Sequence, residues 1–345
     1  MENFKFLNNL PKVELHAHLN GSLNIAAMLE LGEKVYGKKS AEFTDLCERL
    51  TKFEPGCILD ECFKRFAFVH DLTSTKEGLR YATELVIRDF AVDHVMYLEL
   101  RTTPKSNKNM TRREYVQIVL DAIKEARQKF SNIRVKLLLS INRAEPVAVA
   151  DETVTLALEF FKSEPDIVVG MDLSGNPNKG EFKAFTSALH RAGEGGLRLT
   201  LHCAEVNNPK ETKEMLEFGM SRCGHGTHLS AEDIAYLRNH DIPVECCLTS
   251  NIKTGTVSSF VDHHLKRLME AEAPTVLCTD DCGIFDTTLT KEFCVASQSL
   301  GMTDHQCIDL TMQAIKYSFA TEADRSWMIQ QVNKYAKGLE NTAFL

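Results

Sequence analysis

Eight short apolar runs of strand type recur along the chain, and helical patterns lie between them. The runs occupy residues 13–19, 95–100, 135–141, 167–173, 197–203, 222–227, 243–249 and 275–280. Strands that alternate with helices pair in parallel, because each return to the same edge of a sheet needs a crossover. Eight such units predict an α/β fold of the (β/α)8 TIM-barrel type.

Two stretches exceed what a minimal barrel of about 250 residues requires. Residues 20–92 carry three or four helical segments, and residues 286–345 have the pattern of a helical tail. In the first stretch, Ser74 and Glu77 have the spacing of a capping box. We therefore predict one domain over residues 1–345, with a helical cap insertion at about 20–92 over the barrel mouth and a helical C-terminal tail.

The charge balance bears on the class of partner. A net charge of −8 gives no basic surface for nucleic acid or an anionic membrane. No apolar run reaches the ~20 residues of a membrane span, and the first 15 residues lack the apolar segment of a signal peptide. The 11 cysteines include no CxxC pair, which favours reduced thiols. We expect a cytosolic monomer that acts on a small molecule.

Polar side chains gather where the apolar runs end. They are His16 and His18; Arg101, Thr102 and Thr103; Asn142; Asp172, Ser174, Gly175 and Asn176; His202 and Glu205; His225 and His228; Ser250 and Asn251; and Asp280 and Asp281. One polar strand end is usually a helix cap. In a barrel all eight ends meet on one face, where active sites are built, so together they predict a site.

His16 and His18 are two residues apart, and alternation along a strand places both on the same face. Alone, such a short motif is more often two buried histidines with ordinary hydrogen-bond partners. His202 and Asp280, at two further strand ends, would add a nitrogen and an oxygen ligand. Three imidazoles and one carboxylate suit Zn²⁺, so the sequence predicts one zinc ion per chain.

Three further ionisable residues near these ends could take part in proton transfer: Glu205, His225 and Asp281. Hydrolysis at a metal needs a base for the proton of water and an acid for the leaving side. These residues could fill those roles. Their structural alternatives are a carboxylate at a helix N-terminus, a strand-end hydrogen bond and a cap. Glycines at 175, 224 and 226 could let a ligand approach the backbone, or could simply form turns.

The combined motifs identify a resemblance. They are LPKVELHAHLNGSL (10–23), DLSGNP (172–177), LHCAE (201–205), RCGHGTHL (222–229), CLTSN (247–251) and CTDD (278–281). Together they resemble the adenosine deaminase family of metal-dependent hydrolases, and within it the adenosine deaminase-like group that deaminates N6-methyl-AMP. The resemblance covers about residues 10–335.

The resemblance implies a role for each matching residue. His16, His18, His202 and Asp280 match the zinc ligands. Glu205 matches the acid that protonates purine N1, His225 the histidine that orients and deprotonates the water, and Gly175 the glycine whose N–H meets N3. Asp281 matches the aspartate that holds the attacking water and a ring nitrogen. The implied reaction is hydrolytic attack at C6 through a tetrahedral intermediate, with loss of an amine to give a 6-oxopurine.

One position departs from adenosine deaminase itself. Where that enzyme has HLDG, with the aspartate at the ribose 5′-hydroxyl, this chain has HLNG with Asn20. A carboxylate would repel a 5′-phosphate, whereas an amide would not. The second strand end, Arg101 to Lys105, is rich in phosphate donors. The further substrate-binding residues that we expect are His18, Asn20, His70, Thr102, Thr103, Pro104, Lys105 and Asn142, together with Gly175, Glu205 and Asp281.

The leading hypothesis is therefore zinc-dependent deamination of N6-methyl-AMP and other N6-substituted AMP to IMP and an alkylamine, in purine nucleotide metabolism. Adenosine deamination to inosine and ammonia is the alternative within the same class. Hydrolysis of an amide or phosphoester in a similar barrel is another. A non-catalytic purine-nucleotide sensor is the alternative from a different class, and the complete set of ligand and proton-transfer residues disfavours it.

Overall fold

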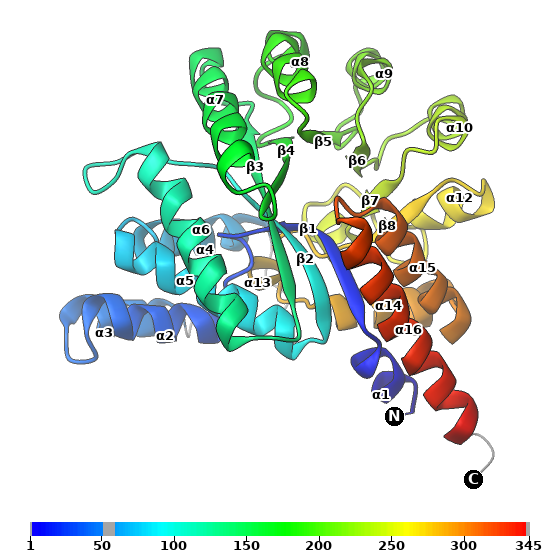
Figure 1. The fold of residues 1–345 in the computed structure, drawn as a ribbon, viewed down its shortest axis with the longest axis horizontal. Coiled ribbons are helices and arrows are strands. Elements are labelled where there is room, and N and C mark those ends of the chain that lie inside the picture. The colour runs from blue at the N-terminus through cyan, green and yellow to red at the C-terminus, as the bar shows by residue number, and fades with distance from the viewer. Residues whose placement is uncertain (1, 51–58, 343–345) are drawn as a thin grey trace.

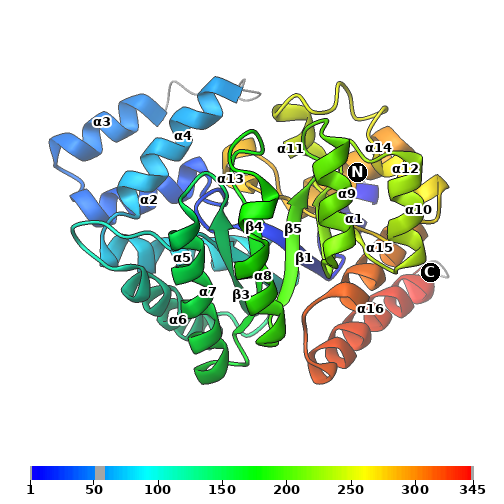
Figure 2. The ribbon, with the colours of Figure 1, turned by 90° about the horizontal axis from the view of Figure 1, so that it is seen from above.

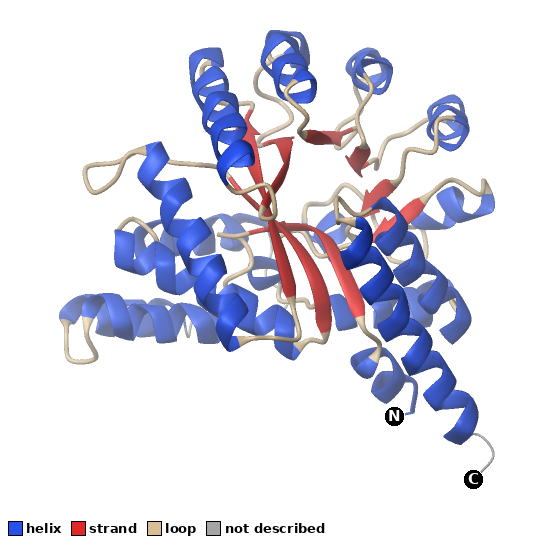
Figure 3. Cartoon of the chain, viewed as in Figure 1, coloured by secondary structure: helices blue, strands red, loops and turns tan. Residues whose placement is uncertain are grey.

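Eight parallel strands form a single sheet in the order in which they occur in the chain. The structure is a computed structural model that describes residues 2–50 and 59–342, with side chains for 4–50 and 65–338. The strands are β1 (Lys12–His18), β2 (Val95–Thr102), β3 (Arg134–Asn142), β4 (Val168–Ser174), β5 (Arg198–Cys203), β6 (Arg222–His225), β7 (Val244–Cys246) and β8 (Thr275–Leu277). Figure 3 shows the strands at the centre, with helices around them.

The sheet nearly closes on itself. Beyond β8, Ala17 and Asp280 form a parallel bridge between the first strand and the last. The His18 N–H donates to the Asp280 carbonyl (3.0 Å), and the Asp280 N–H donates to the His16 carbonyl (2.7 Å). With helices between the strands, this is the (β/α)8 TIM barrel that the sequence predicts. The same backbone bonds bring His16, His18 and Asp280 together.

Helices fill the connections and both expected additions. They are α1 (Glu2–Asn9), α2 (Ile25–Tyr36), α3 (Ala41–Leu50), α4 (Leu59–Leu72), α5 (Lys76–Val92), α6 (Arg112–Lys129), α7 (Val147–Ser163), η1 (Phe182–Ala184), α8 (Thr186–Glu194), α9 (Pro209–Phe218), α10 (Ala231–Asn239), α11 (Leu248–Lys253), α12 (Leu265–Glu270), α13 (Cys282–Phe285), α14 (Leu289–Leu300), α15 (Asp304–Tyr317) and α16 (Glu322–Thr342).

The insertion after β1 contains α2 to α5, which lie on one side of the barrel, away from α9 and α10 (Figures 1 and 2). The tail forms α14, α15 and α16, and α15 packs against β8 and β1. The expected helices are therefore present in both additions. The assignment of the whole chain to one domain stays a prediction. In the described part of the chain, no helix is both long and apolar enough to cross a bilayer.

Local boundaries differ from the sequence predictions at several places. The N-cap of α5 is Thr75, whose hydroxyl accepts from the Gly78 N–H, so the predicted Ser74–Glu77 capping box is wrong. The sixth strand ends at His225, where φ turns to +61°. The seventh ends at Cys246, and the following residues form α11. Ser250 and Asn251 therefore lie on a short helix instead of on a strand end.

A tight backbone contact joins the first strand's loop to the segment after the eighth strand. The N–H groups of Gly283 and Ile284 both donate to the Gly21 carbonyl at 3.0 Å. A Cβ on Gly283 would lie 2.2 Å from the Leu23 carbonyl carbon. Only a residue without a side chain allows α13 to approach this closely.

We expect Gly283→Ala to lower the free energy of unfolding by about 1–3 kcal/mol, because the backbone of Leu23 must move. Gly338 in α16 is the matched control, since a Cβ there meets no atom within 4 Å. Gly338→Ala should leave stability unchanged or raise it by up to about 1 kcal/mol. Urea unfolding of both variants measures the difference, and equal midpoints would contradict the packing argument.

Candidate metal centre and active site

Four side chains converge at the carboxyl ends of the strands. His16, His18, His202 and Asp280 each offer one ligand atom, and these atoms all lie within 4.8 Å of one another. Nε2 of His18 is 3.2 Å from Nε2 of His202 and 3.4 Å from Oδ1 of Asp280. Nε2 of His16 is 3.4 Å from the same Asp280 oxygen. The structure thus brings together the four residues that the sequence predicts as metal ligands.

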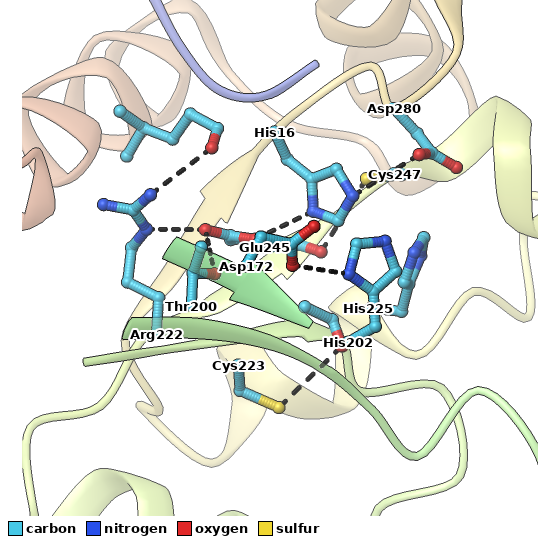
Figure 4. A network of polar contacts seen from close by, with 12 residues as sticks. His16, Asp172, Thr200, His202, Arg222, Cys223, His225, Glu245, Cys247 and Asp280 are labelled. Carbon is cyan, nitrogen blue, oxygen red and sulfur yellow. Dashed lines mark hydrogen bonds and ion pairs between the residues drawn. The ribbon is translucent and has the colours of Figure 1, made fainter. Parts of the chain in front are cut away.

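Two carboxylates and one hydroxyl form hydrogen bonds with three of these four side chains, on the side away from the cluster. Nδ1 of His16 lies 2.8 Å from Oε2 of Glu245, and Nδ1 of His202 lies 2.9 Å from Oδ1 of Asp172. An ionised carboxylate only accepts, so each Nδ1 carries the hydrogen and each Nε2 presents a lone pair to the cluster. Asp280 is held in turn, because the Ser250 hydroxyl donates to its Oδ2 at 2.7 Å. Figure 4 shows both carboxylate–imidazole pairs.

This arrangement fits a bound cation. Nε2 of His16 is buried and has no hydrogen-bond partner, although a carboxylate oxygen lies 3.4 Å away. Two lone pairs at that distance repel each other unless positive charge lies between them. Three imidazole nitrogens and one carboxylate oxygen are a donor set that divalent transition metals favour. The cluster therefore has the donor set and the geometry of a metal site.

A buried ion network lies beneath the cluster. Arg101 donates to Glu245 Oε2 (2.5 Å) and to Asp172 Oδ1 (3.3 Å), the two oxygens that hold the imidazoles. Arg222 contacts the other Glu245 oxygen (2.5 Å) and Glu99 (2.6 Å). Burial opposes ionisation of Glu245, but the two guanidinium groups outweigh it and hold its pKa well below the usual range.

The position of Arg101 corrects one interpretation of the sequence. Its side chain is fully buried inside the barrel, so it cannot contact a phosphate at the mouth. Alternation along β2 explains this placement, because the side chains of neighbouring residues point to opposite faces of a strand. The guanidinium instead fixes the carboxylates that orient His16 and His202.

Glu205 and His225 lie beside the cluster, with Oε2 of Glu205 3.7 Å from Nε2 of His225. Burial raises the pKa of Glu205, which favours a protonated acid. Burial also lowers the pKa of His225 well below its usual range, so its ring is neutral. The pKa of Asp281 is raised well above its usual range by burial and by the charge of Asp280, and its Oδ1 is buried without a partner. A cation bound at Asp280 would offset the second cause and favour the ionised form of Asp281, so that an acid and a proton acceptor would both lie close to the predicted metal ligands.

Positive backbone φ angles accompany these groups. They occur at Ala204 (+54°), His225 (+61°) and Asp280 (+64°), all residues with side chains. Such angles are unfavourable for non-glycine residues and collect at functional sites. Ala204 and His225 lie at the ends of β5 and β6, and Asp280 lies three residues beyond β8. At His225 and Asp280 the residue with the positive φ angle also carries a side chain of the site.

Asn20 lies in a hydrogen-bonded group beside the cap. Its Nδ2 donates to the Thr73 hydroxyl (3.3 Å), and its Oδ1 accepts from the Tyr115 hydroxyl (3.4 Å). Thr73 already donates its own hydrogen to the Val69 carbonyl at 2.7 Å. It can therefore only accept from residue 20, which requires a donor there. The Tyr115 hydroxyl also contacts that of Thr102 at 2.7 Å, so Thr102 joins this group.

His70 and Lys105 form a second polar pair, with Nζ of Lys105 2.7 Å from Nε2 of His70. Burial and the nearby lysine charge lower the pKa of His70 to about 4, so the neutral ring accepts this hydrogen bond. Lys105 and Thr103 are partly exposed, whereas Pro104 is buried. This pair joins the end of β2 to the cap helix α4.

Asn142 and Gly175 adjoin each other at the ends of β3 and β4. Gly175 has a φ of +97°, and a Cβ there would lie 2.2 Å from the Asn142 side-chain oxygen. Only glycine fits both the backbone angle and the space. The Asn142 oxygen accepts from the Ala144 N–H at 3.0 Å.

Several residues of the site escaped the sequence analysis. Glu245, Thr73 and Tyr115 were not singled out, and neither was His263, whose Nε2 lies 3.0 Å from the Asn251 side-chain oxygen. A glutamate inside an apolar run, as at position 245, was an available signal because a buried charge needs a partner. The other three sit in helices and loops where the sequence carries no comparable signal.

A parallel barrel with imidazoles and carboxylates at the carboxyl ends of its strands has the architecture of a TIM-barrel enzyme with its active site at that face. The sequence model of the adenosine deaminase family ("Adenosine deaminase") matches residues 11–335. The chain belongs to the adenosine deaminase family, and it is a hydrolase of the deaminase type.

The similarity to known relatives extends over almost the whole chain. An adenosine deaminase-like protein of Drosophila pseudoobscura is 62% identical over 98% of this chain and 99% of its own length. The human N6-methyl-AMP deaminase is 40% identical over 95% of this chain and 94% of its own. A crystal structure of Arabidopsis ADAL complexed with IMP has a TM-score of 0.86 and 38% identity, covering 97% of this chain and 99% of that one.

We expect Arg101→Met to weaken metal binding by about 10- to 100-fold, because the carboxylates behind His16 and His202 lose their shared partner. Arg222→Met is the matched control, since Arg222 is equally buried but does not contact the two oxygens that hold the imidazoles. Competition with a chromophoric chelator measures the affinity of each folded variant. Equal losses in the two variants would show that Arg101 only stabilises the barrel.

Proposed function

We propose that this protein catalyses the zinc-dependent hydrolytic deamination of N6-methyl-AMP and other N6-substituted AMP, giving IMP and an alkylamine. The observation that carries the nucleotide assignment is the Asn20 amide, held by Thr73 and Tyr115 where a carboxylate would repel phosphate. The names of the relatives support it, since one is an N6-methyl-AMP deaminase and another was crystallised with IMP. A monomer in the cytosol remains the expectation for the protein's state.

Zinc is the metal that we assign to His16, His18, His202 and Asp280, because three imidazoles and one carboxylate match its preferences. When bound, Zn²⁺ supplies the Lewis acidity that makes water nucleophilic near neutral pH. The chain's own contribution is to hold the ligands rigidly, through Glu245 behind His16 and Asp172 behind His202.

Three residues handle protons and orientation in this proposal. Glu205, whose pKa burial raises, gives a proton to purine N1. Asp281, with its unpartnered Oδ1, holds the attacking water and takes its proton, a role that the resemblance gives to His225. His225 orients the same water from the other side. Protonation at N1 draws electrons from C6, so attack and protonation support each other.

The remaining predicted residues would bind the nucleotide. The Gly175 N–H would meet N3 of the purine, beside Asn142, while His18, Glu205 and Asp281 would line the base. The 5′-phosphate would lie toward the second strand end and the cap, where the donors are Asn20, His70, Thr102, Thr103 and Lys105, with Pro104 shaping the turn. Neutral His70 and charged Lys105 form one pair at that end.

A substrate panel tests the proposal directly. We expect zinc-loaded protein to release methylamine from N6-methyl-AMP with a kcat/KM well above those for N6-methyladenosine, AMP and adenosine. Assays of methylamine and ammonia over the four compounds give the ranking. A preference for adenosine would overturn the nucleotide assignment while leaving a deaminase.

We expect Asn20→Asp to lower kcat/KM for N6-methyl-AMP selectively. A carboxylate about 4 Å from a phosphate charge costs roughly 4 kcal/mol at an effective dielectric constant of about 20. Even a quarter of that cost is about fivefold in binding. The ratio of nucleotide to nucleoside kcat/KM is the measurement, because any loss of the Thr73 hydrogen bond affects both substrates alike. An unchanged ratio would place the phosphate away from residue 20.

A further inference from the structure

A chain of buried hydrogen bonds ends on the ring of His225. It begins at the backbone N–H of Leu265 and runs through His263 and Asn251. We propose that Asn251 and His263 are positioning residues that fix the tautomer of His225, so that its Nε2 donates a hydrogen bond. The catalytic consequence rests on the proposed function, whereas the tautomer itself does not.

The first step fixes His263. The Leu265 N–H lies 3.1 Å from its Nδ1, and a backbone amide can only donate. His263 is 1% exposed, and burial lowers its pKa to about 2, so the ring is neutral. A neutral ring that accepts at Nδ1 carries its hydrogen at Nε2.

The second step fixes Asn251. Nε2 of His263 lies 3.0 Å from Oδ1 of Asn251, which must accept because the ring nitrogen donates. The Asn251 NH2 group is therefore on the opposite side of the amide. There it lies 3.5 Å from Nδ1 of His225 and 3.5 Å from the Thr227 hydroxyl. An NH2 group offers only donors, so Nδ1 of His225 is an acceptor.

The third step follows for His225. A neutral ring with a lone pair at Nδ1 carries its hydrogen at Nε2, the atom 3.7 Å from Glu205 Oε2. The backbone around the ring is also fixed, because φ is +61° and His264 Nε2 lies 2.8 Å from the His225 carbonyl oxygen. In Figure 4 the His225 ring lies beside those of His16 and His202.

A histidine beside the attacking water could donate a hydrogen bond to it or take its proton, and this tautomer allows only the first. Nε2–H can donate to the attacking oxygen but has no lone pair with which to take a proton. As the oxygen bonds to C6, the water O–H bond breaks and its proton passes to Asp281, while N1 takes a proton from Glu205. Asp281 then returns the proton to the departing nitrogen as the C6–N6 bond breaks, and the hydroxyl proton restores Glu205.

Asn251→Asp is the decisive substitution because it keeps the shape and removes the donor. Its second carboxylate oxygen would face Nδ1 of His225 and require a hydrogen there. Nuclear magnetic resonance of histidine-labelled, zinc-loaded protein distinguishes the forms, with the His225 signals assigned by comparison with His225→Gln. We expect hydrogen at Nε2 alone in the natural protein and hydrogen at Nδ1 in Asn251→Asp.

Thr227→Val is the control, since it removes the other partner of the Asn251 NH2 group and should leave the tautomer unchanged. Hydrogen at Nδ1 in the natural protein would overturn the proposal without any variant having to fold. An Asn251→Asp spectrum that matches the natural one would overturn it as well. Neither outcome depends on which purine is the substrate, so the proposed function is tested separately.

Kinetics test the consequence for catalysis. A glutamine at 225 keeps an N–H donor near the position of Nε2 but cannot act as a base. We expect His225→Gln to lose less than about 100-fold in kcat, whereas loss of a general base costs on the order of 10²–10⁴. Asn251→Asp should lower kcat by at least about tenfold with KM changed by less than threefold. A loss in His225→Gln above about 10³-fold would return the base role to His225.

Discussion

The buried contacts of Arg101 are the interaction on which the site depends. Its guanidinium contacts one oxygen of Glu245 and one oxygen of Asp172. The same two oxygens accept hydrogen bonds from the imidazoles of His16 and His202. Burying charges costs free energy, and removing one partner of a buried pair costs about 3–5 kcal/mol because the other is left uncompensated. Such a network is a poor source of stability. It is an effective way to hold two imidazoles in one orientation.

The barrel could be predicted because its strands are buried on both faces and therefore appear as apolar runs. The prediction was least accurate for β6 to β8, which are only three or four residues long. At β7 the apolar run continues past the last strand residue into a helix, at Leu248, and apolarity alone does not separate the two. The cap of α5 was misplaced by one residue because Ser74 and Thr75 are both good caps, and only the backbone shows which one accepts.

The ligand cluster could also be predicted, since alternation places His16 and His18 on one face and strand ends meet on one rim. The structure brings these residues together, whereas their chemical roles stay predictions. The supporting residues could not be found in this way. Tyr115 meets Asn20 across 95 residues of sequence, and Glu245 meets His16 across 229. Such contacts depend on how separate helices and strands pack against one another. The hydrophobic periodicity of a single sequence does not indicate which distant residues will meet.

Two asparagines show how the hydrogen-bond donors and acceptors around a position select its side chain. At position 20 the neighbouring Thr73 hydroxyl has given its hydrogen to a carbonyl, so the residue must donate. At position 251 the His263 ring donates to one side of the amide, which leaves only donors on the other. An aspartate would have nearly the same shape at both places and would reverse the polarity of one contact. In the proposed function the amide at position 20 bears on the charge of the substrate, and in the proposed hydrogen-bond chain the amide at position 251 bears on the direction of proton transfer. In both cases the geometry alone would admit either residue, and the position of a single hydrogen decides between them.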